Sequence, residues 1–113
     1  MIKINGHTPR TDENSDLWLP IEAVKPYKNN PRVNGGDPVD AVKASIEKYG
    51  QQDAIIIDKH GVIVAGHTRL KALKELGKSE VKIAYAKVGD RWLTAKECKQ
   101  FRIAHNKTGE IAQ

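Results

Sequence analysis

The chain has 113 residues, a length typical of one domain with a modest core and too short for two domains. Hydrophobic residues make up 39% and charged residues 29%, which predicts a globular cytoplasmic protein, and no apolar run is long enough to cross a membrane. The single cysteine excludes an internal disulfide, and a net charge of +5 fits either an anionic partner or a solvated surface.

The N-terminal third predicts a tail, a strand and a loop. Residues 1–15 are polar and nearly free of large apolar side chains, so we expect a flexible tail there and a domain over residues 16–113. Residues 17–24 predict a strand that Pro20 interrupts, which favours an edge position or a bulge. Residues 25–36 are rich in proline, asparagine and glycine and predict a long loop.

The middle of the chain predicts a helix and then a hairpin. Asp37 and Pro38 favour a helix start, and Gly50 favours its end. One face of this helix is marked by four residues at helical spacing, Val39, Val42, Ile46 and Tyr49. Residues 54–57 predict a buried strand, and the turn at residues 58–61 leads back into a second strand at residues 62–64.

A strand, a glycine and a helix follow one another at residues 62–77. The apolar run stops at Gly66, and leucines at spacings of three then mark a helix. A glycine lets the backbone approach a ligand closely, and the first amides of a helix can hold an anion. Thr68 adds a hydroxyl, or else caps the helix, and Arg69 adds a planar cation suited to phosphate, or else pairs with a surface carboxylate. The stretch therefore predicts a phosphate site.

The C-terminal third predicts one more strand and a last helix. Apolar and other residues alternate over residues 81–85, which indicates a strand. Thr94 and Glu97 form a capping-box pattern, and a helical apolar face follows at Cys98, Phe101 and Ala104. Together these elements predict an α+β domain with a small mixed sheet and three main helices.

Three stretches resemble the amino-terminal domain of ParB-like proteins, which has the ParB/sulfiredoxin fold. Residues 18–32 resemble the opening strand and a loop that ends in Asn-Pro-Arg. Residues 66–72, Gly-His-Thr-Arg-Leu-Lys-Ala, resemble the Gly-x-x-Arg-x-x-Ala box, and residues 104–110 resemble a later box that contains asparagine. Sulfiredoxins place their catalytic cysteine directly after the glycine, where this chain has His67, so that activity is not expected.

The resemblance implies that the three stretches assemble one nucleotide pocket. The nucleotide- or phosphate-binding residues that it implies are Gly66, His67, Thr68, Arg69, Arg32, Asn106 and Lys107. His67 and Glu110 are the catalytic candidates. Without the resemblance, Arg32 reads as a solvated turn residue, and Asn106 and Lys107 read as an ordinary helix C-terminus. The four histidines show no metal-binding spacing, so no structural metal is expected.

Three functions are compatible with these observations. The first is a domain that binds CTP or ATP, with Mg²⁺ accompanying the nucleotide and hydrolysis left open, in the DNA metabolism or partition of a phage or mobile element. The second is a nuclease that acts directly on DNA. The third is a non-catalytic module that binds DNA or a protein, such as a DNA methyltransferase or a partition partner, through a basic face.

Overall fold

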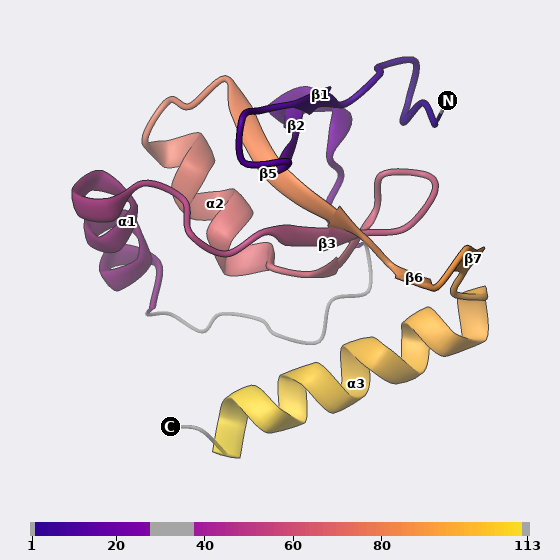
Figure 1. Cartoon of the computed structure of the whole chain (residues 1–113). Helices are drawn as coiled ribbons and strands as arrows, with labels where there is room; N and C mark the ends of the chain where they lie inside the picture. Colours follow the sequence, from indigo (N-terminus) through magenta and orange to yellow (C-terminus); the bar gives the residue numbers. More distant parts are fainter. Residues whose placement is uncertain (1, 28–37, 112–113) are drawn as a thin grey trace.

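The protein folds as a five-stranded mixed sheet with helices packed against it (Figure 1). The computed structural model describes residues 2–27 and 38–111, with side chains for residues 39–104 of the second range. Within these ranges the strands of the sheet are β1 (Arg10–Thr11), β2 (Leu17–Pro20), β3 (Ile55–Ile57), β4 (Ile63–Ala65) and β5 (Glu80–Tyr85). The helices are α1 (Pro38–Tyr49), α2 (His67–Glu75) and α3 (Ala95–Ile111). The predicted α+β class, with a small mixed sheet and three main helices, is confirmed.

The strand order is β1-β2-β5-β3-β4, so the central strand of this sheet is the last of its five strands in the sequence. β5 pairs antiparallel with β2 and parallel with β3, and β3 pairs antiparallel with β4 in the predicted hairpin. A parallel pair needs a crossover connection, which β4 and α2 provide here. The start of α2 therefore lies directly after β4, at one edge of the sheet.

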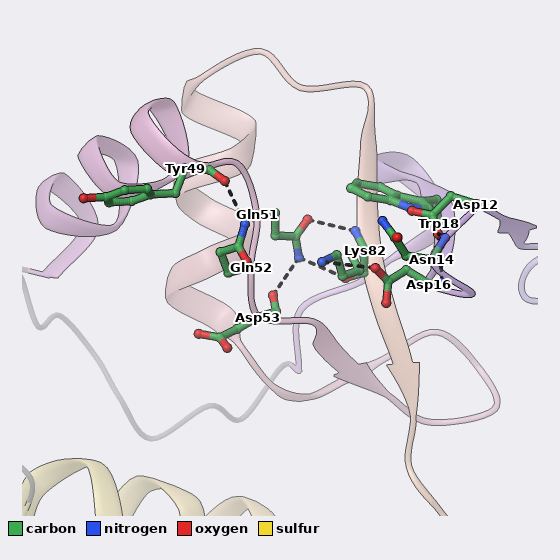
Figure 2. Close-up of polar contacts among 9 residues, drawn as sticks. All are labelled: Asp12, Asn14, Asp16, Trp18, Tyr49, Gln51, Gln52, Asp53 and Lys82. Carbon is green, nitrogen blue, oxygen red and sulfur yellow. Dashed lines mark hydrogen bonds and ion pairs between the residues drawn. The ribbon is translucent and has the colours of Figure 1, made fainter.

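Helices α1 and α2 cover one face of the sheet. Ile55 and Ile57 of β3 point into this face and are fully buried beneath Leu70 and Leu73 of α2. α1 begins at Pro38 and ends before Gly50, as predicted. The prediction that Tyr49 belongs to the apolar face is wrong, because its side chain lies at the end of the helix and is 61% exposed. Figure 2 shows its ring pointing away from the sheet.

Helix α3 packs against the opposite face. Successive strand residues alternate between faces, so Ile56 and Val64 point away from the first core and meet Cys98 and Phe101 of α3. The predicted capping box is confirmed, because Glu97 Oε1 accepts from the Thr94 amide at 2.8 Å and Thr94 Oγ1 accepts from the Glu97 amide at 3.1 Å. A short hairpin of β6 (Lys87–Val88) and β7 (Arg91–Trp92), which the sequence analysis did not predict, leads into this helix.

Two predictions for α3 are wrong. Ala104 is exposed rather than part of the apolar face, and Arg102 is buried instead, with 8% of its surface accessible. The helix also continues to Ile111, so residues 105–107 lie within it rather than after it. Helical spacing from Cys98 and Phe101 is compatible with either Arg102 or Ala104 on the inward face. The prediction chose Ala104 because it is the apolar residue of the two.

The N-terminal segment is packed against the fold, so the prediction of a loose tail over residues 1–15 is wrong for the described part of it. Ile4 is fully buried, and the Asn5 side chain donates to the carbonyls of Ala23 and His60 at 2.8 and 3.0 Å. β1 pairs with β2. A single buried isoleucine and a two-residue strand are too short to produce a periodic sequence signal. β2 ends at Pro20, where a 3₁₀ turn, η1 (Ile21–Ala23), begins.

A polar network joins the central strand β5 to the segment before β3 and to β2 (Figure 2). The Gln51 side chain accepts from the Lys82 amide at 2.8 Å and donates to the Lys82 carbonyl at 3.0 Å. The Trp18 ring lies between the cations of Arg10 and Lys82, and its indole N–H donates to Asp12. Trp18 thus anchors the sheet through its ring and its indole N–H. Across the described ranges, no helix combines the length and apolar character needed to span a bilayer.

Candidate functional site

The turn between β4 and α2 has the geometry that the sequence predicts. β4 ends at Ala65, Gly66 has φ 114° and ψ 25°, and α2 begins at His67. This left-handed conformation disfavours residues with a side chain. A Cβ on Gly66 would also lie only 3.2–3.4 Å from atoms of Ile55. Gly66 is therefore required by the backbone conformation and by its close approach to β3.

The first amides of α2 are not paired within the part of the chain that the structure describes. Leu70 is the first residue of the helix whose amide bonds back along the chain, to the Gly66 carbonyl at 3.0 Å. The amides of His67, Thr68 and Arg69 have no acceptor among the described residues. Gly66 is the N-cap and no side chain caps the helix, so the alternative role of Thr68 as a cap is not observed. No acidic residue lies in the first turn, so the local field favours an anion.

Arg69 is paired with Asp53, the carboxylate partner that the sequence analysis gave as the alternative to phosphate. Its guanidinium Nη2 lies 3.3 Å from Asp53 Oδ2, and 74% of the Asp53 side chain is exposed. Such an exposed ion pair is weak and exchangeable. Both residues also line a cavity of about 110 Å³ between α1 and the start of α2. This volume is smaller than that of a typical ligand pocket, so the cavity admits part of a nucleotide at most.

His67 serves as a hydrogen-bond acceptor. Its Nε2 accepts from the backbone amide of Tyr27 at 3.1 Å, so the neutral ring carries its proton on Nδ1. Burial, and then the positive charge of Arg102, lower the pKa of His67 from 6.5 to about 4. The ring is therefore neutral at pH 7. In the described part of the chain Nδ1 has no partner, which leaves one N–H donor at the start of α2.

Sequence reasoning missed Arg102 and Tyr27. Nε and Nη2 of Arg102 donate to the Ile63 carbonyl at 3.1 and 3.0 Å, and its guanidinium carbon lies 3.8 Å from the centre of the Tyr27 ring. No carboxylate of the described residues forms an ion pair with Arg102. The sequence signal for Arg102 was its spacing of four from Cys98 on a face that is otherwise apolar.

The structure brings together only part of the predicted site. Gly66, His67, Thr68 and Arg69 form one turn. Arg32 lies outside the described residues. Asn106, Lys107 and Glu110 lie in α3, but their side chains are outside the described set. The convergence of the three stretches on one pocket therefore stays a prediction.

The described residues do not form a metal centre of their own. Within them, no group of three or more histidine, cysteine, aspartate or glutamate side chains is placed to hold an ion. Mg²⁺ commonly binds through substrate phosphates together with one or two carboxylates. The donors in this part of the chain therefore do not fit an ion held by protein groups alone.

Comparison with known proteins identifies relatives of this chain. The model of the ParB N-terminal domain matches residues 7–98. The ParB-like nuclease domain-containing protein YnaK of Escherichia coli K12 is 30% identical over 67 residues, which is 59% of this chain and 77% of that protein.

Two solved structures share the fold. The C-terminally truncated chromosome-partitioning protein ParB of Caulobacter crescentus, complexed with CTP-gamma-S, matches 80% of this chain with a TM-score of 0.67 and 22% identity. This chain spans 52% of that structure. Sulfiredoxin from Arabidopsis thaliana matches 76% of this chain, and 94% of its own, with a TM-score of 0.59 and 21% identity. These similarities confirm the predicted ParB/sulfiredoxin-like fold.

Proposed function

The chain belongs to the ParB N-terminal domain family, and we propose that it binds a nucleoside triphosphate, CTP or ATP, at the Gly66 turn as part of a process that acts on DNA. The observation that carries this proposal is the set of three amides at the start of α2 that have no acceptor among the described residues, with no acidic residue in the first turn. Backbone amides at a helix start are a common phosphate-binding arrangement. The Caulobacter relative in complex with a CTP analogue supports a nucleotide as the source of the phosphate.

Nearby side chains add to the attraction for an anion. Arg69 is free to exchange the exposed Asp53 carboxylate for a phosphate, to which a guanidinium can make two parallel hydrogen bonds. Arg102 is charged and buried, and its field reaches His67 at the turn. The neutral His67 ring offers one donor, so we expect Arg69 to contribute more binding energy than His67.

Any Mg²⁺ in this function is expected to arrive with the nucleotide. Mg²⁺ neutralises phosphate charge when it is bound to a triphosphate. Because the described residues form no metal cluster, we assign no protein ligand to the ion. The proposal therefore concerns binding, and it leaves hydrolysis to be measured.

The test is a thermal-shift screen of nucleoside triphosphates with and without Mg²⁺, followed by calorimetric titration of the best one. A ligand that binds only the folded state must raise its apparent stability. A charged hydrogen bond contributes roughly 1.5–3 kcal/mol, and 1.4 kcal/mol is a factor of ten, so Arg69→Ala should weaken binding about tenfold or more. His67→Ala should weaken it less. Asp53→Asn is the matched control, because it removes the competing carboxylate and should leave affinity equal or higher.

Equal affinity of the wild type and Arg69→Ala would refute the role of Arg69. No stabilisation by any triphosphate would refute the proposed function. In that case a second candidate gains weight, a DNA nuclease, which the name of the Escherichia coli relative favours. It predicts metal-dependent DNA cleavage that is lost when the residues of the turn are changed. DNA binding without cleavage would instead indicate a non-catalytic DNA-binding module.

A further inference from the structure

The segment at residues 25–27 runs beside β4 at Lys25 and no longer pairs with it at Tyr27. The Lys25 amide donates to the Gly61 carbonyl at 2.8 Å, and the Ile63 amide donates to the Lys25 carbonyl at 2.9 Å. These two bonds form a parallel bridge between Lys25 and Val62. In a parallel ladder the next bond would join the Tyr27 amide to the Ile63 carbonyl.

That next bond is absent from this described segment, and two side chains take its place. The Tyr27 amide donates to His67 Nε2 at 3.1 Å. The Ile63 carbonyl accepts from Nε and Nη2 of Arg102 at 3.1 and 3.0 Å. Buried backbone groups need hydrogen-bond partners. His67 therefore satisfies the donor of the missing ladder bond, the Tyr27 amide, and Arg102 satisfies its acceptor, the Ile63 carbonyl. The Tyr27 ring also stacks on the Arg102 guanidinium, at 3.8 Å.

We propose that Arg102 is a positioning residue for His67. Arg102 donates to the Ile63 carbonyl, so this carbonyl is not available as an acceptor for the Tyr27 amide. The Tyr27 amide donates to Nε2 of His67 instead, and Nε2 is therefore the unprotonated nitrogen of the ring. Nδ1–H is left as the single donor of the ring at the Gly66 turn. Arg102 thus acts from α3 through its contacts with Ile63 and Tyr27.

The arrangement has a specific alternative state. Without a donor from Arg102, the Ile63 carbonyl would be unpaired, and an unpaired buried acceptor is unfavourable. The Tyr27 amide can then restore the ladder by bonding to Ile63. His67 would lose the donor that holds its Nε2 unprotonated, and its neutral form would no longer be confined to one tautomer.

Nitrogen-15 NMR of the ligand-free protein tests the proposal. In the wild type we expect an unprotonated Nε2 on His67 and a scalar coupling across the hydrogen bond between Tyr27 N and His67 Nε2. Arg102→Met should abolish this coupling, produce a coupling between Tyr27 N and the Ile63 carbonyl carbon, and raise the pKa of His67 from about 4 towards 6.5. Lys99→Gln, which removes one exposed positive charge from the same helix, should change none of these signals.

Arg102→Lys is the second variant, because an ammonium can donate to the same carbonyl and should preserve the Tyr27–His67 coupling. A protonated Nε2 in the wild type would overturn the proposal. Unchanged signals in a folded Arg102→Met protein would overturn it too, as would loss of the coupling in a folded Arg102→Lys protein. If Arg102→Met does not fold, the wild type and Arg102→Lys decide the question.

The proposed function enters here at one point only: it supplies the nucleotide to which Nδ1–H of His67 would donate. If His67 donates to the nucleotide, Arg102→Met should weaken nucleotide binding several-fold while Lys99→Gln does not. Failure of the wild type to bind any triphosphate would refute the proposed function and leave the coupling result standing. Nucleotide binding with a protonated Nε2 would refute the role of Arg102 and leave the proposed function standing.

Discussion

Replacement of Gly66 by alanine tests why this turn needs glycine. A side chain at φ 114° is strained by roughly 1–2 kcal/mol. The new Cβ would also lie 3.2 Å from Ile55 Cγ1 and 3.3 Å from its Cα, so β3 must shift by a few tenths of an ångström. Overpacking of this kind costs roughly 1–3 kcal/mol. Because the contact is only slightly too short, the cost here should lie in the lower half of that range, at about 1–2 kcal/mol. Reduced freedom of the unfolded chain offsets about 0.4–1 kcal/mol. The net loss is about 2 kcal/mol.

Gly77→Ala is the matched control. Gly77 has φ 74°, and a Cβ there would meet nothing within 4 Å, so this variant carries the backbone strain without the contact. We expect it to lose about 1 kcal/mol or less. The assay is urea unfolding followed by circular dichroism, with the slope of the transition checked for each variant. If Gly66→Ala and Gly77→Ala are equally stable within about 0.3 kcal/mol, the close approach to Ile55 does not matter and the reasoning is wrong.

Two further predictions concern stability. The pKa of His67 is about 4 in the folded state and 6.5 in the unfolded state, so the unfolded state binds more protons between these two values. The free energy of unfolding is therefore highest above pH 6.5 and falls as the pH drops towards 4. After discounting for its partial exposure, the loss between pH 7 and 4.5 should be about 1–2 kcal/mol larger in the wild type than in His67→Gln, and an equal loss would contradict the shift. Gln51→Ala should lower the free energy of unfolding by about 2–3 kcal/mol, because it unpairs both backbone groups of Lys82. Gln52→Ala, which loses one exposed bond to the Tyr49 carbonyl, should change stability by less than about 0.5 kcal/mol in the same unfolding experiment.

The features that sequence predicted well are those with a local cause. The glycine at residue 66 lies between an apolar run and a helical pattern, and this order of residues defines the turn by itself. The capping box of Thr94 and Glu97 likewise depends only on residues three apart. These signals are enough to place β4, α2 and the start of α3.

The features that sequence missed depend on residues that are distant along the chain. Arg102 donates to the carbonyl of Ile63, which lacks its ladder partner because the chain pairs with this edge at Lys25 but no longer at Tyr27. The role of His67 as an acceptor depends on the Tyr27 amide in the same way. Ile4 is buried by a contact with a turn more than fifty residues away, near Gly61. No short window of sequence contains these relations.

The strand order has a consequence for how the chain folds during synthesis. β5 is the centre of the sheet, yet it is the last strand of the sheet to leave the ribosome. Until then β2 lacks a partner strand on the side that faces β5. β3 likewise lacks a partner on its side away from β4. Pairing of Leu17 with Ile83 is a highly non-local contact, which slows folding. The nascent chain must therefore keep two unpaired strand edges from other chains until Tyr85 has emerged, so a chain stopped before Glu80 should aggregate rather than fold.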